Sequence, residues 1–135
     1  MSIMFVEEQI FPVSVKVPQR GGVAADVWDI LQVLCQGQGT LMEEEDGFVD
    51  GWAVHVIPAG ETAGEMLDLD EEDTTREMLQ EYLLALPEGT GVAVSLVLDR
   101  GEYTSTKLYR RTADGFVLVM RTSADAREGF SLEVF

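Results

Sequence analysis

The residues best suited to chemistry in this sequence are carboxylates, and they gather in two stretches. Five acids fall within residues 43–50 and nine within residues 61–81, where a single arginine stands among them. Carboxylates gathered on one surface steer a positively charged protein toward it and complement its charge. We therefore expect a partner-binding surface with Phe48 as its apolar anchor and with these acids around it: Asp68, Asp70, Glu71, Glu72, Asp73, Glu43, Glu44, Glu45, Asp46 and Asp50.

The acids of residues 68–73 also suit roles that need no partner. Carboxylates just before a helix interact favourably with its dipole, each by roughly 0.3–1 kcal/mol, although one or two would suffice for that. A solvated charged face is a second alternative. The Asp-x-Asp-x-Glu order that begins at Asp68 resembles the start of a calcium-binding EF-hand loop, but Asp73 stands where that loop requires glycine and Leu79 where it requires glutamate. We expect no metal site here.

The turn-rich segment of residues 43–52 leaves two alternatives open, because its acids flank two aromatic residues, Phe48 and Trp52. In the first, both aromatic side chains enter the core and the acids are solvated. In the second, Phe48 stays exposed within a ring of carboxylates, which is a composition suited to recognising a basic surface.

No pattern in the sequence indicates nucleophilic or cofactor chemistry. His55 is the only histidine, and no Gly-x-Ser-x-Gly or comparable motif supplies it with a nucleophile, so we expect it to be structural. Cys35, the only cysteine, lacks a neighbouring base and suits a small buried position. The Gly-x-Gly at Gly37 follows a predicted helix rather than a strand, unlike a nucleotide-binding loop. We expect neither an enzyme nor a cofactor.

Charge and composition limit the partners. The chain has 135 residues with 9 Lys and Arg against 25 Asp and Glu, a net charge of −16. Residues 1–88 carry all of this excess, whereas residues 89–135 hold six acids and six bases. Because binding a phosphate backbone takes Lys and Arg, direct binding to nucleic acid is not expected. A single cysteine, no basic leader and no apolar run longer than the seven residues 92–98 favour a cytoplasmic protein without a membrane span.

Hydrophobic spacing predicts a single α+β domain over residues 1–135. A helix is expected at about residues 23–36, where apolar residues recur at helical spacing, and a second at about 75–86. The second helix follows a capping-box sequence, Thr74 to Glu77, and carries an apolar stripe made of Met78, Leu79, Tyr82, Leu83 and Leu86.

The remaining segments alternate as strands do. We expect an antiparallel sheet of about five or six strands, packed by the two helices and ending in a C-terminal meander. The adjacent residues Arg110 and Arg111 would point to opposite faces of this sheet. The expected strands are residues 3–17 (one or two edge strands), 51–57, 92–98, 103–112, 116–122 and 130–135.

Size, charge and layout together favour an inhibitory protein that binds a basic partner. The analogy is with small acidic immunity proteins that neutralise bacterial toxins by covering a positively charged active-site cleft. A phage-type DNA mimic that inhibits a nuclease, as anti-restriction and anti-CRISPR proteins do, stays open as an alternative, and so does a small ligand-binding or adaptor domain. Homo-oligomerisation through an edge strand, residues 10–17 or 130–135, is also open.

Overall fold

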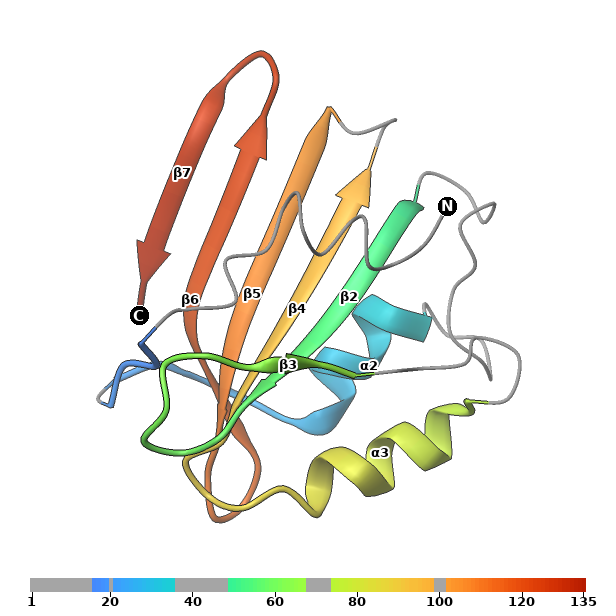
Figure 1. Cartoon of the computed structure of the whole chain (residues 1–135), viewed down its shortest axis with the longest axis vertical. Helices are drawn as coiled ribbons and strands as arrows, with labels where there is room; N and C mark the ends of the chain where they lie inside the picture. The colour runs from blue at the N-terminus through green and yellow to red at the C-terminus, as the bar shows by residue number, and fades with distance from the viewer. Residues whose placement is uncertain (1–15, 20, 36–48, 68–73, 99–101) are drawn as a thin grey trace.

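The computed structural model describes residues 16–19, 21–35, 49–67, 74–98 and 102–135, and these form one antiparallel sheet with two helices on one face (Figure 1). The strand order is β1-β6-β5-β4-β2-β3, and β7 also pairs with β6. The α+β class and the C-terminal meander are thus confirmed. In chain order the elements are β1 (Val23–Ala25), α2 (Val27–Cys35), β2 (Val49–Ile57), β3 (Glu65–Met66), α3 (Arg76–Leu84), β4 (Gly91–Leu98), β5 (Tyr103–Arg111), β6 (Phe116–Asp125) and β7 (Gly129–Val134).

Helix α2 begins four residues later than predicted, because residues 23–25 form strand β1 and pair with residues 116–118 of β6. Asp26 sets the boundary. Its Oδ1 accepts a hydrogen bond from the Asp29 N–H at 3.1 Å, and Asp29 Oδ2 accepts one from the Asp26 N–H at 2.8 Å. This reciprocal cap satisfies amide groups that the start of a helix leaves without an intrahelical partner. The predicted end of the helix, residue 36, lies outside the described residues.

Helix α3 begins at Arg76, one residue later than predicted, because the second of two adjacent threonines caps it rather than Thr74. Thr75 is the N-cap, and its hydroxyl accepts a hydrogen bond from the Met78 N–H at 3.2 Å. The helix ends at Leu84, two residues earlier than predicted, and Pro87 follows shortly afterwards. Leu86 therefore lies beyond the helix, although it still packs against the core.

The core occupies both faces of the sheet, which explains the nearly continuous apolar sequence of β2. Trp52 and Val54 of this strand face the helices, whereas Ile57 faces the other side, and His55 is fully buried between Val54 and Val56. Strand β2 is therefore buried on both faces. The helix-side cluster consists of Val27, Ile30, Leu31, Trp52, Val54, Leu79, Leu83, Val92, Val94, Tyr109 and Phe116, and the opposite cluster of Val17, Ile57, Ala93, Leu108 and Val119.

The side chains of the two adjacent arginines of β5, Arg110 and Arg111, lie on opposite faces of the sheet, as the alternation of side chains along a strand predicts. Arg110 Nε donates to the Pro18 carbonyl oxygen at 3.1 Å. On the helix side, the Arg111 guanidinium donates to the carbonyl oxygens of Leu84 at 2.9 Å and Gly115 at 2.8 Å, which ties the end of α3 to the β5–β6 hairpin. Within the described part of the chain, both side chains are thus held by backbone carbonyls rather than by carboxylates.

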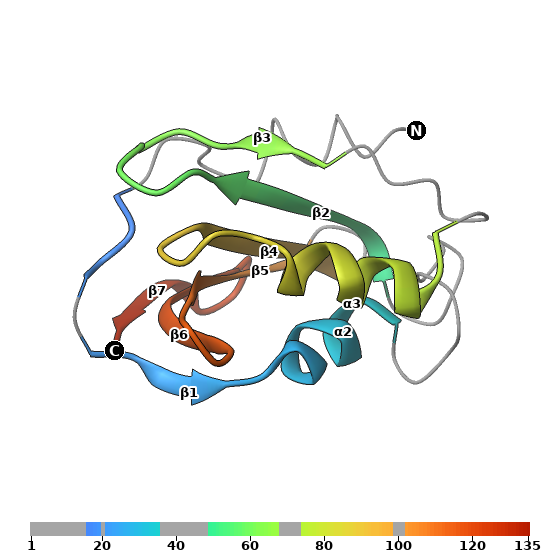
Figure 2. The ribbon, with the colours of Figure 1, turned by 90° about the horizontal axis from the view of Figure 1, so that it is seen from below.

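The outer edge of β6 is shared by two segments that are far apart in the sequence. Strand β7 pairs with residues 120–125, and β1 continues along residues 116–118. The two segments meet where the Phe135 N–H donates to the Val119 carbonyl at 3.1 Å (Figures 1 and 2). Gly21 stands at this junction with φ +72°, and a Cβ there would lie 3.0 Å from the Phe135 carbonyl oxygen, so glycine fits both the conformation and the space.

Candidate protein-binding surface

The predicted partner-binding residues fall almost entirely outside the described part of the chain. Phe48 and the acids at 43–46, 68 and 70–73 are among the residues that it omits. Asp50 lies in β2 at a β-bulge, where the pairing with β4 shifts between Val49 and Gly51. The placement of these residues as one surface therefore stays a prediction.

Helix α3, which overlaps the end of the second acidic stretch, exposes part of its apolar stripe. Leu79 and Leu83 are buried against the sheet, whereas Met78 is 55% exposed and Tyr82 is 42% exposed. The cause is geometric, because successive helical residues are rotated by about 100° and only one line of the stripe can face the core. The apolar stripe is therefore wider than the part of α3 that contacts the core, and Met78 and Tyr82 remain exposed to solvent.

Trp28 joins α2 to the same exposed region. It lies on the outer side of α2 with 41% of its surface exposed, and the Arg76 guanidinium of α3 sits 4.6 Å from its ring centroid. This cation–π contact connects the start of α3 to α2, and the two helices lie side by side (Figure 2). The exposure of Trp28 could have been predicted from the sequence, because this residue lies off the helical face that carries the buried Val27, Ile30 and Leu31.

Carboxylates accompany these exposed apolar side chains. Asp26 and Asp29 are exposed at the start of α2, and Glu77 and Glu81 are exposed one turn apart on α3. Arg76 is the only basic residue within the two described helices. We call this region the helix surface and define it by Trp28, Met78, Tyr82, Asp26, Asp29, Glu77 and Glu81.

A hollow of about 420 Å³ lies beside the helix surface, between β1, α2 and the strands β5 and β6. Asp29, Gln32, Lys107 and Tyr109 are among the residues that line it. Burial, with a further contribution from the negative charge of Asp29, raises the pKa of Tyr109 to about 12. The Tyr109 hydroxyl thus keeps its proton even in alkaline solution and can act as a hydrogen-bond donor to a group in the hollow.

Neither a metal site nor a membrane span is present in the described part of the chain. Its His, Cys, Asp and Glu residues form no group of three or more that could hold a metal ion. None of its helices has both the length and the apolar character needed to cross a bilayer.

Comparison with protein-family models, with curated proteins and with solved structures finds no match for this chain.

Proposed function

We propose that this chain binds a basic protein through its helix surface. The observation that carries the proposal is the exposure of Trp28, Met78 and Tyr82 on two helices whose other charged side chains, apart from Arg76, are carboxylates. Aromatic residues and methionine are enriched at protein interfaces, and an exposed aromatic group surrounded by acids suits a positively charged partner.

The specific form of the proposal is an inhibitor that acts in the cytoplasm as an immunity protein. It would cover the positively charged active-site cleft of a bacterial toxin that acts on nucleic acids or nucleotides. Carboxylates complement such a cleft, and the charge of −16 steers a basic partner toward the inhibitor. The same charge makes a phosphate backbone a poor partner.

The test begins with capture of partners from the native cells at low and at high salt, with identification by mass spectrometry. The captured basic protein is then purified, and its association and dissociation rates are measured with the wild-type chain and with the double variant Glu77→Lys/Glu81→Lys. Because surface charges act mainly on encounter, we expect the variant to associate roughly tenfold more slowly, with a smaller change in dissociation.

A matched control separates the helix surface from the overall charge. Glu61→Lys/Glu65→Lys makes the same change in net charge at exposed positions in and near β3. We expect this control to slow association much less than Glu77→Lys/Glu81→Lys does. Equal effects of the two variants would show that only net charge matters, and no effect of either would refute docking on the helix surface.

The hollow favours a second candidate function, the binding of a small polar ligand. Its volume is within the range of small-molecule sites, and a carboxylate, an ammonium group and a protonated phenol line it. Native mass spectrometry of the protein purified from its own cells tests this candidate. A bound small molecule that is lost in Lys107→Met, but retained in Glu77→Lys/Glu81→Lys, would support it, and an empty chain would count against it.

A further inference from the structure

Strand β7 presents an apolar row at the edge of the sheet. Phe130 is 70% exposed, Leu132 54% and Val134 60%, and every residue of the strand is exposed. The register places the three opposite Ala124, Thr122 and Met120 of β6, and Met120 packs with the core cluster on the face away from the helices. The β6–β7 hairpin extends beyond the helices (Figure 1), and no described strand pairs with the outer edge of β7.

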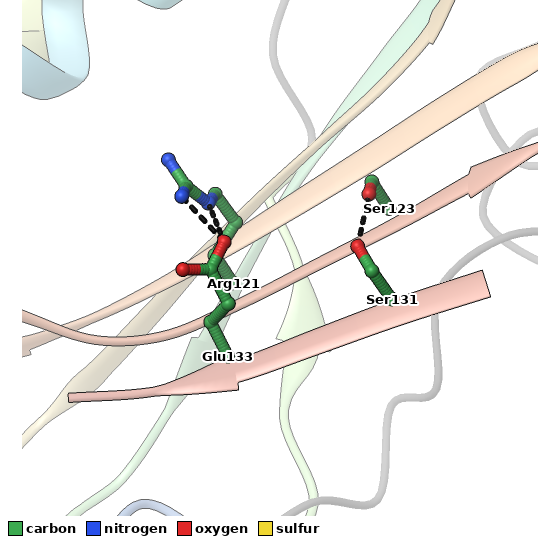
Figure 3. Close-up of polar contacts among 4 residues, drawn as sticks. All are labelled: Arg121, Ser123, Ser131 and Glu133. Atoms are coloured by element: carbon green, nitrogen blue, oxygen red, sulfur yellow. Dashed lines mark hydrogen bonds and ion pairs between the residues drawn. The ribbon is translucent and has the colours of Figure 1, made fainter.

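The polar side chains of β7 are engaged with β6 on the other face. Glu133 accepts hydrogen bonds from Arg121 Nε at 3.1 Å and Nη2 at 2.5 Å, and the Ser131 and Ser123 hydroxyls are 2.6 Å apart (Figure 3). The hydrogen bond to Glu133, together with the negative charge of this carboxylate, raises the pKa of Arg121 above its ordinary value. These contacts tie β7 to β6, and Arg121 neutralises the only charge of the strand.

Edge strands are usually protected from pairing by lysine, proline, bulges or unpaired charges. Strand β7 has the sequence Gly-Phe-Ser-Leu-Glu-Val, which contains neither lysine nor proline, and its pairing with β6 is regular over all six residues. None of the usual protective devices is present in this strand.

The backbone of β7 is also oriented for pairing. Because the Phe135 N–H donates to Val119 of β6, the alternation of an antiparallel ladder directs the odd-numbered residues toward β6. The N–H and C=O groups of Phe130, Leu132 and Val134 then point outward. The residues with outward-facing backbone groups are therefore the same three that carry the apolar row.

The strand is complementary to itself. If a second copy pairs antiparallel about a two-fold axis at Leu132, then Leu132 faces Leu132, Phe130 faces Val134, and Ser131 faces Glu133. Apolar side chains meet apolar ones, and Glu133 avoids a second carboxylate. Such pairing is isologous, as in most two-fold dimers.

The charge distribution makes this edge the most favourable place for two copies to meet. Residues 89–135, which supply β4 to β7, hold six acids and six bases, whereas the preceding 88 residues carry the entire excess of 16 negative charges. We propose that two copies of this chain associate through β7, so that their two sheets form one continuous antiparallel sheet.

The test is sedimentation velocity of the full chain over a hundredfold range of concentration, at low and at high salt. We expect a monomer–dimer equilibrium that salt strengthens, because salt screens the repulsion between two chains of charge −16. Partner binding by the helix surface should respond to salt in the opposite direction, so the failure of either proposal is distinguishable from failure of the other. A monomer at every concentration would overturn the dimer.

Two matched variants locate the contact. Leu132→Lys places two ammonium groups at the two-fold axis and should weaken the dimer at least tenfold, whereas Met78→Lys makes the same change of charge on the helix surface and should leave the dimer intact. Both replaced side chains are more than half exposed, so both variants should fold. Equal effects of the two substitutions would overturn the assignment to β7.

Crosslinking tests the register. With Cys35 replaced by alanine, Leu132→Cys should form a disulfide between two copies, because residues facing each other across an antiparallel pair have Cα atoms about 5.5 Å apart. Phe130→Cys faces Val134 of the second copy and should crosslink much more slowly. Equal crosslinking of the two variants would overturn the proposed register.

Discussion

Ionisation of the Tyr109 hydroxyl tests whether this group is buried in the hollow between α2 and the sheet. Its pKa is raised to about 12, first by burial and then by the negative charge of Asp29. A tyrosine in the unfolded chain has a pKa of about 10. Below pH 10 both forms keep the proton, and the folded state has its full stability. Between pH 10 and pH 12 only the unfolded chain releases the proton, so stability falls as the pH rises.

The expected loss follows from the size of the shift. Each pKa unit corresponds to about 1.4 kcal/mol, so a shift of two units sets an upper limit of roughly 3 kcal/mol. Because Tyr109 lines a hollow that is partly open to solvent, which weakens the effect of burial, we expect about 2 kcal/mol. Tyr109→Phe has no group to ionise at this position and should lack this part of the loss.

The assay is urea denaturation of the wild type and Tyr109→Phe at intervals between about pH 9 and pH 12, which compares the two free energies of unfolding. The difference in ultraviolet absorbance between the two proteins during an alkaline titration gives the ionisation curve of Tyr109 directly. Asp29→Asn removes the negative charge but keeps an oxygen that can accept the bond from the Asp26 N–H. Because burial is the larger cause of the shift and remains, this variant should lower the Tyr109 pKa only in part. Parallel stability curves for wild type and Tyr109→Phe would refute a shielded hydroxyl.

Substitutions at three further sites test the packing and the hydrogen bonds of the fold. Leu83→Ala removes a fully buried side chain of α3 and should lower the free energy of unfolding by about 3 kcal/mol in urea denaturation. Thr75→Ala removes the N-cap bond to the Met78 N–H and should cost about 1 kcal/mol, whereas Thr75→Ser should cost much less; equal losses would contradict the capping role. Ser95→Ala leaves the buried Thr106 hydroxyl without its bond of 3.0 Å and should cost about 1–2 kcal/mol, while Ser95→Ala combined with Thr106→Val should recover most of the loss in a double-mutant cycle.

The parts of the fold that the sequence predicts well depend on neighbouring residues. The cap of α3, which the sequence places within one residue of Thr75, is a local hydrogen bond, and the meander of β4 to β7 is built from alternating segments joined by short turns. Strand β1 is hidden in the sequence, because its three small apolar residues continue the helical spacing of α2. What makes them a strand is pairing with residues 116–118, which lie far away in the sequence.

The candidate site is harder to predict for the same reason. The helix surface combines Trp28 of α2 with Met78 and Tyr82 of α3, and only the packing of two separate helices brings these residues together. The sequence places Met78 and Tyr82 in the same apolar stripe as Leu79 and Leu83, but the width of the sheet contact decides which of them are buried. The concentration of acids in two stretches is visible in the sequence, and its role stays a prediction.

The shared outer edge of β6 bears on the order in which the molecule assembles. Ala25 pairs with Phe116, about ninety residues later in the chain, whereas each meander strand pairs with its immediate neighbour. Closing a long loop costs more chain entropy than closing a short one, so the meander should form first and β1 should dock onto it afterwards. During synthesis β1 and α2 leave the ribosome well before β6 exists. Strand β1, although it is made earlier than the meander, should therefore be among the last segments to reach its final position.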